Sequence, residues 1–179
     1  ANRSSRGLGD VYKRQEHYGW ADRDLKYRFS WTFPISFSPH DSNTVYACGN
    51  HVFASRDEGM SWEALSPDLT RADDSKLDVS GGLTVDSSGA ETYGTISTFA
   101  ESSHQPGKYW AGTDDGVVHL STDGGKLWGN VTPKDLPEWA YIYCIETSTH
   151  DPDVLYLSAT RYKLDDYRPC LLYTSPSPR

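Results

Sequence analysis

The sequence is poor in cysteine and methionine and lacks long apolar runs, and each shortage excludes a class of protein. Three cysteines and one methionine occur in 179 residues. The cysteines form no Cys/His cluster and decide neither disulfide pairing nor the redox compartment. The six histidines lack metal-ligand spacing, so we expect no bound metal. No apolar stretch approaches the roughly 20 residues of a membrane-spanning helix, so we expect no membrane insertion.

Sequence motifs of several enzyme classes are also missing. The chain contains no glycine-rich phosphate loop, no Gly-x-Ser-x-Gly elbow and no dinucleotide fingerprint, and we expect no cofactor. The formal net charge of −8 argues against binding to nucleic acid or to an anionic membrane surface. Tryptophan and tyrosine are abundant instead, and glycine, serine, threonine and aspartate are frequent. This composition is typical of an all-β, extracellular-type domain with many turns.

The two ends of the chain are related to each other through their coding DNA. Residues 5–15 back-translate to a transposase-type sequencing adapter, and the opposite strand of that oligonucleotide encodes residues 170–179. We therefore interpret residues 1–15 and 170–179 as non-native tails of translated adapter that carry no information about the natural fold. Residues 16–169 are expected to be a piece of a longer natural protein, so the absence of a signal peptide does not bear on localisation.

Two octapeptides share the pattern Ser-x-Asp-x-Gly-x-x-Trp, at residues 55–62 and 121–128. In this spacing the aspartate accepts backbone N–H groups inside a tight turn, and glycine supplies the positive φ that the turn needs. The serine hydroxyl bonds at the edge of the turn, and the tryptophan anchors the next strand. We therefore assign the aspartates a structural role. The corner residues are Ser55, Asp57, Gly59 and Trp62, and Ser121, Asp123, Gly125 and Trp128.

A longer repeat surrounds these corners. His40, His104 and His150 each precede a turn-rich stretch, and in each case an aromatic residue follows the histidine by six positions. The histidines are expected to form hydrogen bonds at turns or strand ends. Internal similarity with four short strands per unit is typical of a propeller. The fold class is therefore all-β, a fragment with two to three four-stranded blades of a larger β-propeller.

The repeats also divide the chain into segments. Residues 16–34 are expected to be the end of a preceding blade or an approach strand. Blades are predicted at 35–65 and 94–132, with a truncated third blade at 133–169. Residues 66–93 form an inter-blade insertion, which either lies on a ligand-binding face of the disc or is a solvated surface loop. Within the second blade, Asp115-Gly116 predicts a two-residue hairpin of type I′.

The octapeptides follow the pattern of the Asp-box, or BNR, repeat, and the chain resembles part of a BNR β-propeller. The resemblance runs from Tyr27 to Pro169 and is strongest to bacterial sortilin-like proteins that are labelled "glycosyl hydrolase"; it includes residues 66–70, 110–116, 136–139 and 161–166. It implies an exported module that binds a protein, peptide or glycan and is completed by the remaining blades of a longer chain. The alternative is part of a glycoside hydrolase acting on a polysaccharide, with catalytic acids partly or wholly outside this fragment. In these families the Asp boxes lie away from the active site.

Candidate site residues lie outside the corners. Glycoside hydrolysis needs two carboxyl groups facing one bond, and Asp114 and Asp165, on neighbouring blades, are candidates for that pair. Asp115 is interpreted as a turn residue. Trp139 is either a stacking platform for a sugar or a cover for the next blade's core. The charged run at residues 161–168 either recognises sugars or peptide carboxylates or forms an inter-blade salt-bridge cluster, and its candidate ligand-binding residues are Arg161, Tyr162, Asp165 and Asp166.

Overall fold

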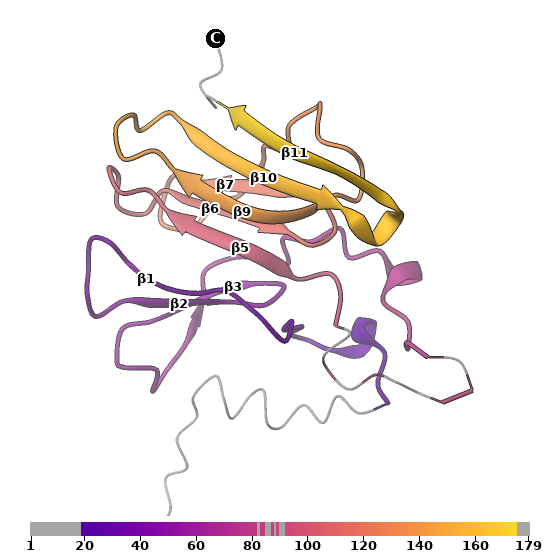
Figure 1. Cartoon of the computed structure of the whole chain (residues 1–179). Coiled ribbons are helices and arrows are strands. Elements are labelled where there is room, and N and C mark those ends of the chain that lie inside the picture. Colours follow the sequence, from indigo (N-terminus) through magenta and orange to yellow (C-terminus); the bar gives the residue numbers. More distant parts are fainter. Residues whose placement is uncertain (1–18, 82, 85–86, 88, 90–91, 175–179) are drawn as a thin grey trace, which may run out of the picture.

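A computed structural model describes residues 19–81, 83–84, 87, 89 and 92–174, and the regular secondary structure of this part of the chain consists mainly of antiparallel strands (Figure 1). The expected adapter tail at residues 1–15 lies outside the described residues. The first sheet contains β1 (Ile35–Phe37), β2 (Val45–Cys48), β3 (Val52–Ser55) and β4 (Glu63–Ala64), in that order. The second contains β5 (Ile96–Glu101), β6 (Tyr109–Thr113), β7 (Val118–Ser121) and β8 (Gly129–Asn130), in that order. The third contains β9 (Tyr141–Thr147), β10 (Leu155–Arg161) and β11 (Asp166–Thr174), with β10 in the middle.

Helical structure is limited to three short 3₁₀ turns in the described part of the chain. These turns are η1 (Asp22–Asp24), η2 (Asp74–Lys76) and η3 (Tyr162–Leu164). No helix among the described residues is long and apolar enough to cross a membrane. The same residues contain no group of three or more acidic, histidine or cysteine side chains that could hold a metal ion.

The apolar cores lie between the sheets. Tyr46 of β2 packs with Phe99 and Tyr109 of the second sheet, at ring-centroid distances of 5.1 and 5.5 Å. Trp110, the next residue along β6, belongs instead to the core that the second sheet shares with β9 and β10. This division follows from strand geometry, because successive side chains point to opposite faces. Each large side chain that is fully buried here contributes about 1.5–3 kcal/mol to stability.

Two of the three repeated histidines, His40 and His104, join neighbouring sheets. The ring N–H of His40 at Nε2 donates to the carbonyl oxygen of Ser102 at 2.7 Å. His104 makes the equivalent bond to the carbonyl of Ser148 at 3.1 Å. Both acceptors lie just beyond a strand, so the expected strand-end bonding is present, but it crosses to the next sheet. Ser102 and Ser148 occupy the same repeat position, and the sheets are therefore stacked by one recurring contact.

The aspartates of the two Ser-x-Asp-x-Gly-x-x-Trp octapeptides lie in tight β corners. The Asp57 carboxylate accepts bonds from the Ser61 backbone N–H at 2.8 Å and hydroxyl at 2.6 Å, and these bonds lower its pKa. Asp123 accepts the backbone N–H groups of Lys126 and Leu127, both at 3.0 Å. The hydroxyl of the corner serine also accepts the N–H of Gly59 or Gly125, at 2.9 and 3.0 Å. The bonds account for both aspartates as supports of the turn.

Each corner contains two successive residues in the left-handed region. In the first corner these are Glu58 and Gly59, and in the second Gly124 and Gly125. The indole N–H of Trp128 donates at 3.0 Å to the carbonyl oxygen of Leu65, the residue that follows β4 of the first sheet, while that of Trp62 bonds within its own corner. The second corner therefore also ties its sheet to the preceding one.

Residues 27–33, in the segment that precedes the first sheet, contain no strand. The ring of Phe29 stacks on Phe53 of β3 at 5.7 Å, and the Asn50 N–H donates to the Arg28 carbonyl at 2.9 Å. One local expectation is wrong. The loop after β6 is not a type I′ turn, because Gly116 has a positive φ and Asp115 does not. The bond from the Gly116 N–H to the Thr113 carbonyl, at 3.4 Å, defines instead a three-residue loop ending in a left-handed glycine.

β11 continues across the expected start of the C-terminal adapter tail. Cys170 and Leu171 pair with Ala159 and Ser158 of β10. Pairing with an open strand edge requires only a β-compatible segment, whatever its origin. The three cysteines, Cys48, Cys144 and Cys170, are free thiols.

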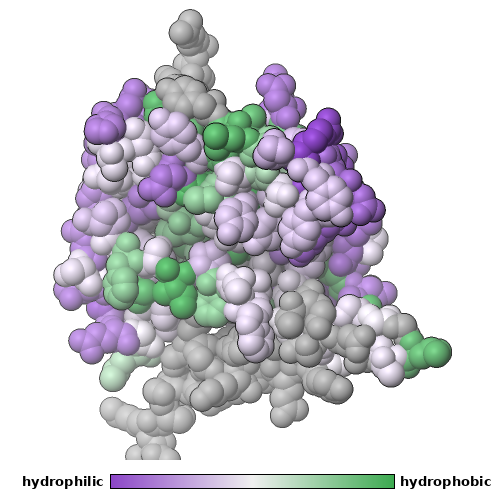
Figure 2. Space-filling model, in the orientation of Figure 1, coloured by the Kyte–Doolittle hydropathy of each residue, from purple (hydrophilic) through white to green (hydrophobic). Residues whose placement is uncertain are grey.

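The outer faces of the first and third sheets leave large apolar side chains exposed. In the first sheet these are Ile35 and Phe37, and in the third Tyr143 and Leu171, each more than 60% exposed. Figure 2 shows apolar patches within a surface that is otherwise largely hydrophilic. Patches at both ends of a stack of sheets are typical of surfaces that another element covers.

Candidate functional site

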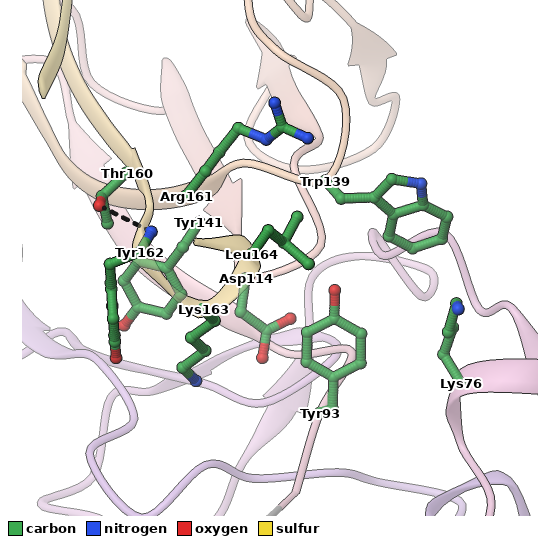
Figure 3. A pocket seen from close by; sticks show the side chains of 10 residues that line it. All are labelled: Lys76, Tyr93, Asp114, Trp139, Tyr141, Thr160, Arg161, Tyr162, Lys163 and Leu164. Carbon is green, nitrogen blue, oxygen red and sulfur yellow. Dashed lines mark hydrogen bonds between the residues drawn. The ribbon is translucent and has the colours of Figure 1, made fainter. Parts of the chain in front are cut away.

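A cavity of about 320 Å³ opens where the second and third sheets meet the insertion (Figure 3). Asp114 reaches it from the loop after β6, and Trp139 from the connection that precedes β9. The insertion supplies Lys76 and Tyr93, and the third sheet and η3 supply the other lining residues. The lining consists of Lys76, Tyr93, Asp114, Trp139, Tyr141, Thr160, Arg161, Tyr162, Lys163 and Leu164. Segments far apart in the chain thus build one site.

Asp114 is the carboxyl group among these lining residues, and it is only 7% exposed. Its two oxygens accept the backbone N–H and the hydroxyl of Thr95, each at 2.9 Å. Burial raises the pKa of Asp114 to about 7, although the Thr95 bonds oppose the rise. Figure 3 shows its carboxyl group between Tyr93 and Lys163. The group can therefore exist in either protonation state near neutral pH, and both states can bond to a ligand hydroxyl.

Asp115 lies beside Asp114 but does not line the cavity. Its carboxylate accepts the Thr113 hydroxyl at 2.6 Å and the backbone N–H of Arg71 at 2.8 Å. Burial raises its pKa, and the bonds to Thr113 and Arg71 work against that rise. This carboxylate therefore supports the loop and anchors the insertion to it.

Trp139 has a strained backbone, with a φ of +59°. Such a value is rare for a bulky side chain, and it occurs where the surrounding structure enforces it. The N–H of Ala140 bonds to the Pro137 carbonyl at 3.2 Å, and Gly116 packs directly against the backbone of Trp139 and Ala140. A β-carbon on Gly116 would lie 3.3 Å from the Trp139 Cα. The strained turn therefore depends on a glycine in the loop between β6 and β7.

Arg71 supports the indole ring of Trp139. Its guanidinium lies 4.5 Å from the ring centroid, a cation–π distance. The Arg71 Nε–H donates to the Asp115 carbonyl at 2.8 Å, and a terminal nitrogen contacts Glu138 at 3.4 Å. Arg71 does not line the cavity, so it holds Trp139 from outside. This residue of the insertion thus joins the loop of the second sheet to the aromatic wall.

The residues singled out from the sequence are only partly gathered in this cavity. Asp114, Trp139, Arg161 and Tyr162 line it, while Asp165 and Asp166 do not. Asp165 is exposed and closes η3 through its backbone N–H, which bonds to the Tyr162 carbonyl at 3.2 Å. The structure therefore does not place the carboxyl groups of Asp114 and Asp165 in one lining.

The charged run at the end of β10 makes ion pairs among its own members. Asp166 accepts two bonds from Arg168, at 2.9 and 2.8 Å, and the Arg168 bonds hold its pKa well below the usual range. Arg161 lies 3.6 Å from Asp166, and Figure 3 shows its guanidinium directed away from Asp114. Arg161 thus contributes its stem, rather than its charge, to the part of the cavity around Asp114.

Several lining residues were not identified from the sequence. Tyr93 and Lys76 come from the insertion, which has no period, and Tyr141 lies in the predicted third blade. Lys163 belongs to the charged run at residues 161–168 but was not among its candidate ligand-binding residues. The one available signal was the length of the insertion, because a long inter-blade insertion can lie on a ligand-binding face.

The raised pKa of Asp114 predicts a pH-dependent stability. The unfolded carboxyl has a pKa near 3.8 and the folded one near 7, so the folded chain binds the extra proton between these values. The contribution of Asp114 to the free energy of unfolding is therefore full below about pH 4 and falls by up to about 1.4 kcal/mol per pH unit until about pH 7. Asp114→Asn should remove this fall, which urea denaturation at several pH values would measure.

Thr113 provides the matched control for this prediction. Thr113→Val removes a hydroxyl bonded to Asp115 in the same loop but leaves Asp114 in place. Thr113→Val should lower the free energy of unfolding at every pH, and this free energy should still decline between pH 4 and pH 7. A decline in Asp114→Asn as steep as in the parent chain would contradict the prediction.

Comparison with known proteins gives similarity at the level of structure. No family model matches the chain, and no curated protein matches it significantly. The GH74 xyloglucanase from Xanthomonas campestris superposes with a TM-score of 0.52 at 13% identity, covering 79% of this chain and 20% of its own. The GH74 enzyme of Niastella koreensis superposes with a TM-score of 0.44 at 16% identity, covering 70% of this chain and 16% of its own. The structure of YCF48 bound to D1 peptide superposes with a TM-score of 0.44 at 17% identity, covering 81% of this chain and 42% of its own.

The chain thus spans about a fifth of the length of the xyloglucanase. The likeness to that protein, a β-propeller, shows the fold alone. Together with the sheet order, it confirms that the chain is all-β and is a fragment of a β-propeller.

Proposed function

We propose that this chain is part of an exported Asp-box propeller that binds a glycan in the cavity around Asp114 and Trp139. The observation that carries the proposal is the cavity itself. It combines four aromatic side chains with one buried carboxyl group, contributed by the insertion, the second sheet and the third sheet. Ligand sites are usually concave and mostly apolar, with a few placed polar groups, and about 320 Å³ lies within their size range.

Aromatic rings and a carboxyl group suit a sugar. Tyr93, Trp139, Tyr141 and Tyr162 offer flat apolar surfaces on which the CH face of a sugar ring can stack. Asp114 and Thr160 can bond to its hydroxyl groups. The strained backbone of Trp139 supports the same reading, because strain of this kind collects at ligand sites. A compact cavity also favours a sugar unit over an extended peptide, which is usually held along a sheet edge or groove.

The hydrogen bonds of the two corners support the Asp-box assignment. In both, one aspartate and one serine satisfy the backbone of a turn with two left-handed residues. The resemblance to sortilin-like proteins is the ground for proposing export. The exposed apolar faces of the first and third sheets support further blades as partners, supplied by a longer chain.

Polysaccharide hydrolysis is the second candidate, and Asp114 favours it. A carboxyl group with a pKa of about 7 has the protonation expected of a general acid. Hydrolysis also requires a second carboxyl group about 5–9.5 Å from the first. Among the residues that line the cavity, Asp114 is the single acid. We therefore favour binding, since catalysis would need an acid from another part of a longer protein.

Binding and cleavage can be separated with one set of polysaccharides. The full 179-residue chain is titrated with soluble oligosaccharides, including those of xyloglucan, and reducing-end release is measured in the same samples. We expect saturable binding without release. Release of sugar that disappears in Asp114→Asn would favour the hydrolase instead. Absence of binding to every saccharide tested would contradict the proposed function.

A further inference from the structure

We propose that the saccharide bound in this cavity carries an anionic group, such as the carboxylate of a uronic acid, and that Lys76 and Lys163 recognise it. This inference rests on the proposed function and specifies its ligand. Both lysines line the cavity, Lys76 from η2 in the insertion and Lys163 from η3. Figure 3 shows the two side chains on either side of Tyr93 in the lining of the same cavity.

Within the described part of the chain, neither lysine forms an ion pair. Most other cations there do, and the paired ones are Arg23, Arg28, Arg56, Arg71, Lys108, Arg161 and Arg168. The close contacts of the two lysines are with aromatic rings instead. Lys76 Nζ lies 5.9 Å from the Trp139 ring centroid, and Lys163 Nζ lies 5.6 Å from that of Tyr141. These ammonium groups therefore retain donors and charge for a ligand.

Cationic side chains outnumber the acidic one in the cavity lining, in contrast to the whole chain. The chain carries a formal net charge of −8, yet Lys76 and Lys163 bring two positive charges to this lining. The attraction between Lys163 and Asp114 opposes the effect of burial on the Asp114 pKa. Hydrogen bonds lower the pKa of Asp73, and Lys76 adds to this effect. The opposing carboxyl group, on Asp114, is buried and bonded to Thr95 through both oxygens. An acidic surface repels anionic polymers in general, so a local cationic pair selects those anions that also fit the aromatic wall.

The anionic group should be compact and attached directly to a sugar ring, as a carboxylate is in a uronic acid. An ammonium group is a point charge with three donors, which suits a carboxylate that can approach from several directions. The aromatic wall supplies the affinity for the ring, and the lysines supply the preference for its charge. A neutral sugar of the same size would gain only the first of these contributions.

The test compares a short oligouronate with the neutral oligosaccharide of equal length and the same linkage. Calorimetric titration of the full chain at low salt should give about 10-fold tighter binding of the oligouronate, and the difference should shrink at 0.5 M salt. Lys76→Gln and Lys163→Gln should each weaken oligouronate binding about 3- to 10-fold and weaken binding of the neutral sugar less, so that the ratio of the two affinities falls. Lys126→Gln is the control, because Lys126 is exposed in the second corner and does not line the cavity.

The outcomes separate this inference from the proposed function. Equal affinity for the two ligands, with unchanged binding in both lysine variants, would overturn the inference and leave glycan binding intact. Absence of binding to either ligand would instead count against the cavity as a glycan site. A loss caused equally by Lys126→Gln would show a general charge effect and would also overturn it.

Discussion

Trp139→Ala should weaken glycan binding by about 30- to 150-fold, the largest effect that we expect on affinity. The indole forms one wall of the cavity and is held in place by the Arg71 guanidinium at 4.5 Å. Removing a central aromatic side chain from a binding site commonly costs about 2–3 kcal/mol, which corresponds to this range. Calorimetric titration with the saccharide that binds best would measure it.

A second substitution at the same position separates binding from folding. Trp139→Gly should lose affinity to the same extent, yet it relieves a backbone held at φ +59° and should therefore cost little stability. Trp31→Ala is the matched control, since Trp31 is 73% exposed and lies outside the cavity lining. Unchanged affinity in Trp139→Ala would place the ligand elsewhere on the molecule.

Gly125→Ala should be the most destabilising of the substitutions considered. A β-carbon on Gly125 would lie 2.7 Å from the carbonyl oxygen of Leu65 and 3.0 Å from its Cβ, in the neighbouring sheet. The same carbonyl accepts the indole N–H of Trp128, so relieving the clash would also disturb that bond. With φ at +91°, the total cost should be about 3–4 kcal/mol, measured by urea denaturation.

The neighbouring glycine isolates the contact between the sheets. Gly124 also has a positive φ, at +76°, but a β-carbon there would meet nothing within 4 Å. Gly124→Ala should therefore cost only the backbone strain, about 1–2 kcal/mol. Equal losses in the two variants would mean that the approach of the second corner to Leu65 does not stabilise the stack.

The elements that were predicted well are those whose interactions are local. Asp57 bonds to Ser61, and Asp123 to Lys126 and Leu127, so each corner is complete within a few residues. Strands could be predicted for the same reason, and β1 to β4 lie within the first predicted blade, residues 35–65. The type I′ prediction for Asp115-Gly116 was wrong because the loop between Thr113 and Val117 contains three residues rather than two. The Asp115 carboxylate is also bonded to Arg71, 44 residues away, and no local signal in the sequence predicts this contact.

The sequence by itself determined the class of fold, since alternating strands and self-bonded corners depend on spacings of two to seven residues. Only the tertiary structure decided which side chains share the cavity. It joined Asp114 to Tyr93, Trp139 and Lys163, and it left Asp165 outside. The physical reason is that the cavity lies between sheets and an insertion without a repeat. Its geometry depends on how those bodies pack, through contacts such as Arg71 on Trp139, and no periodicity along the chain encodes such contacts.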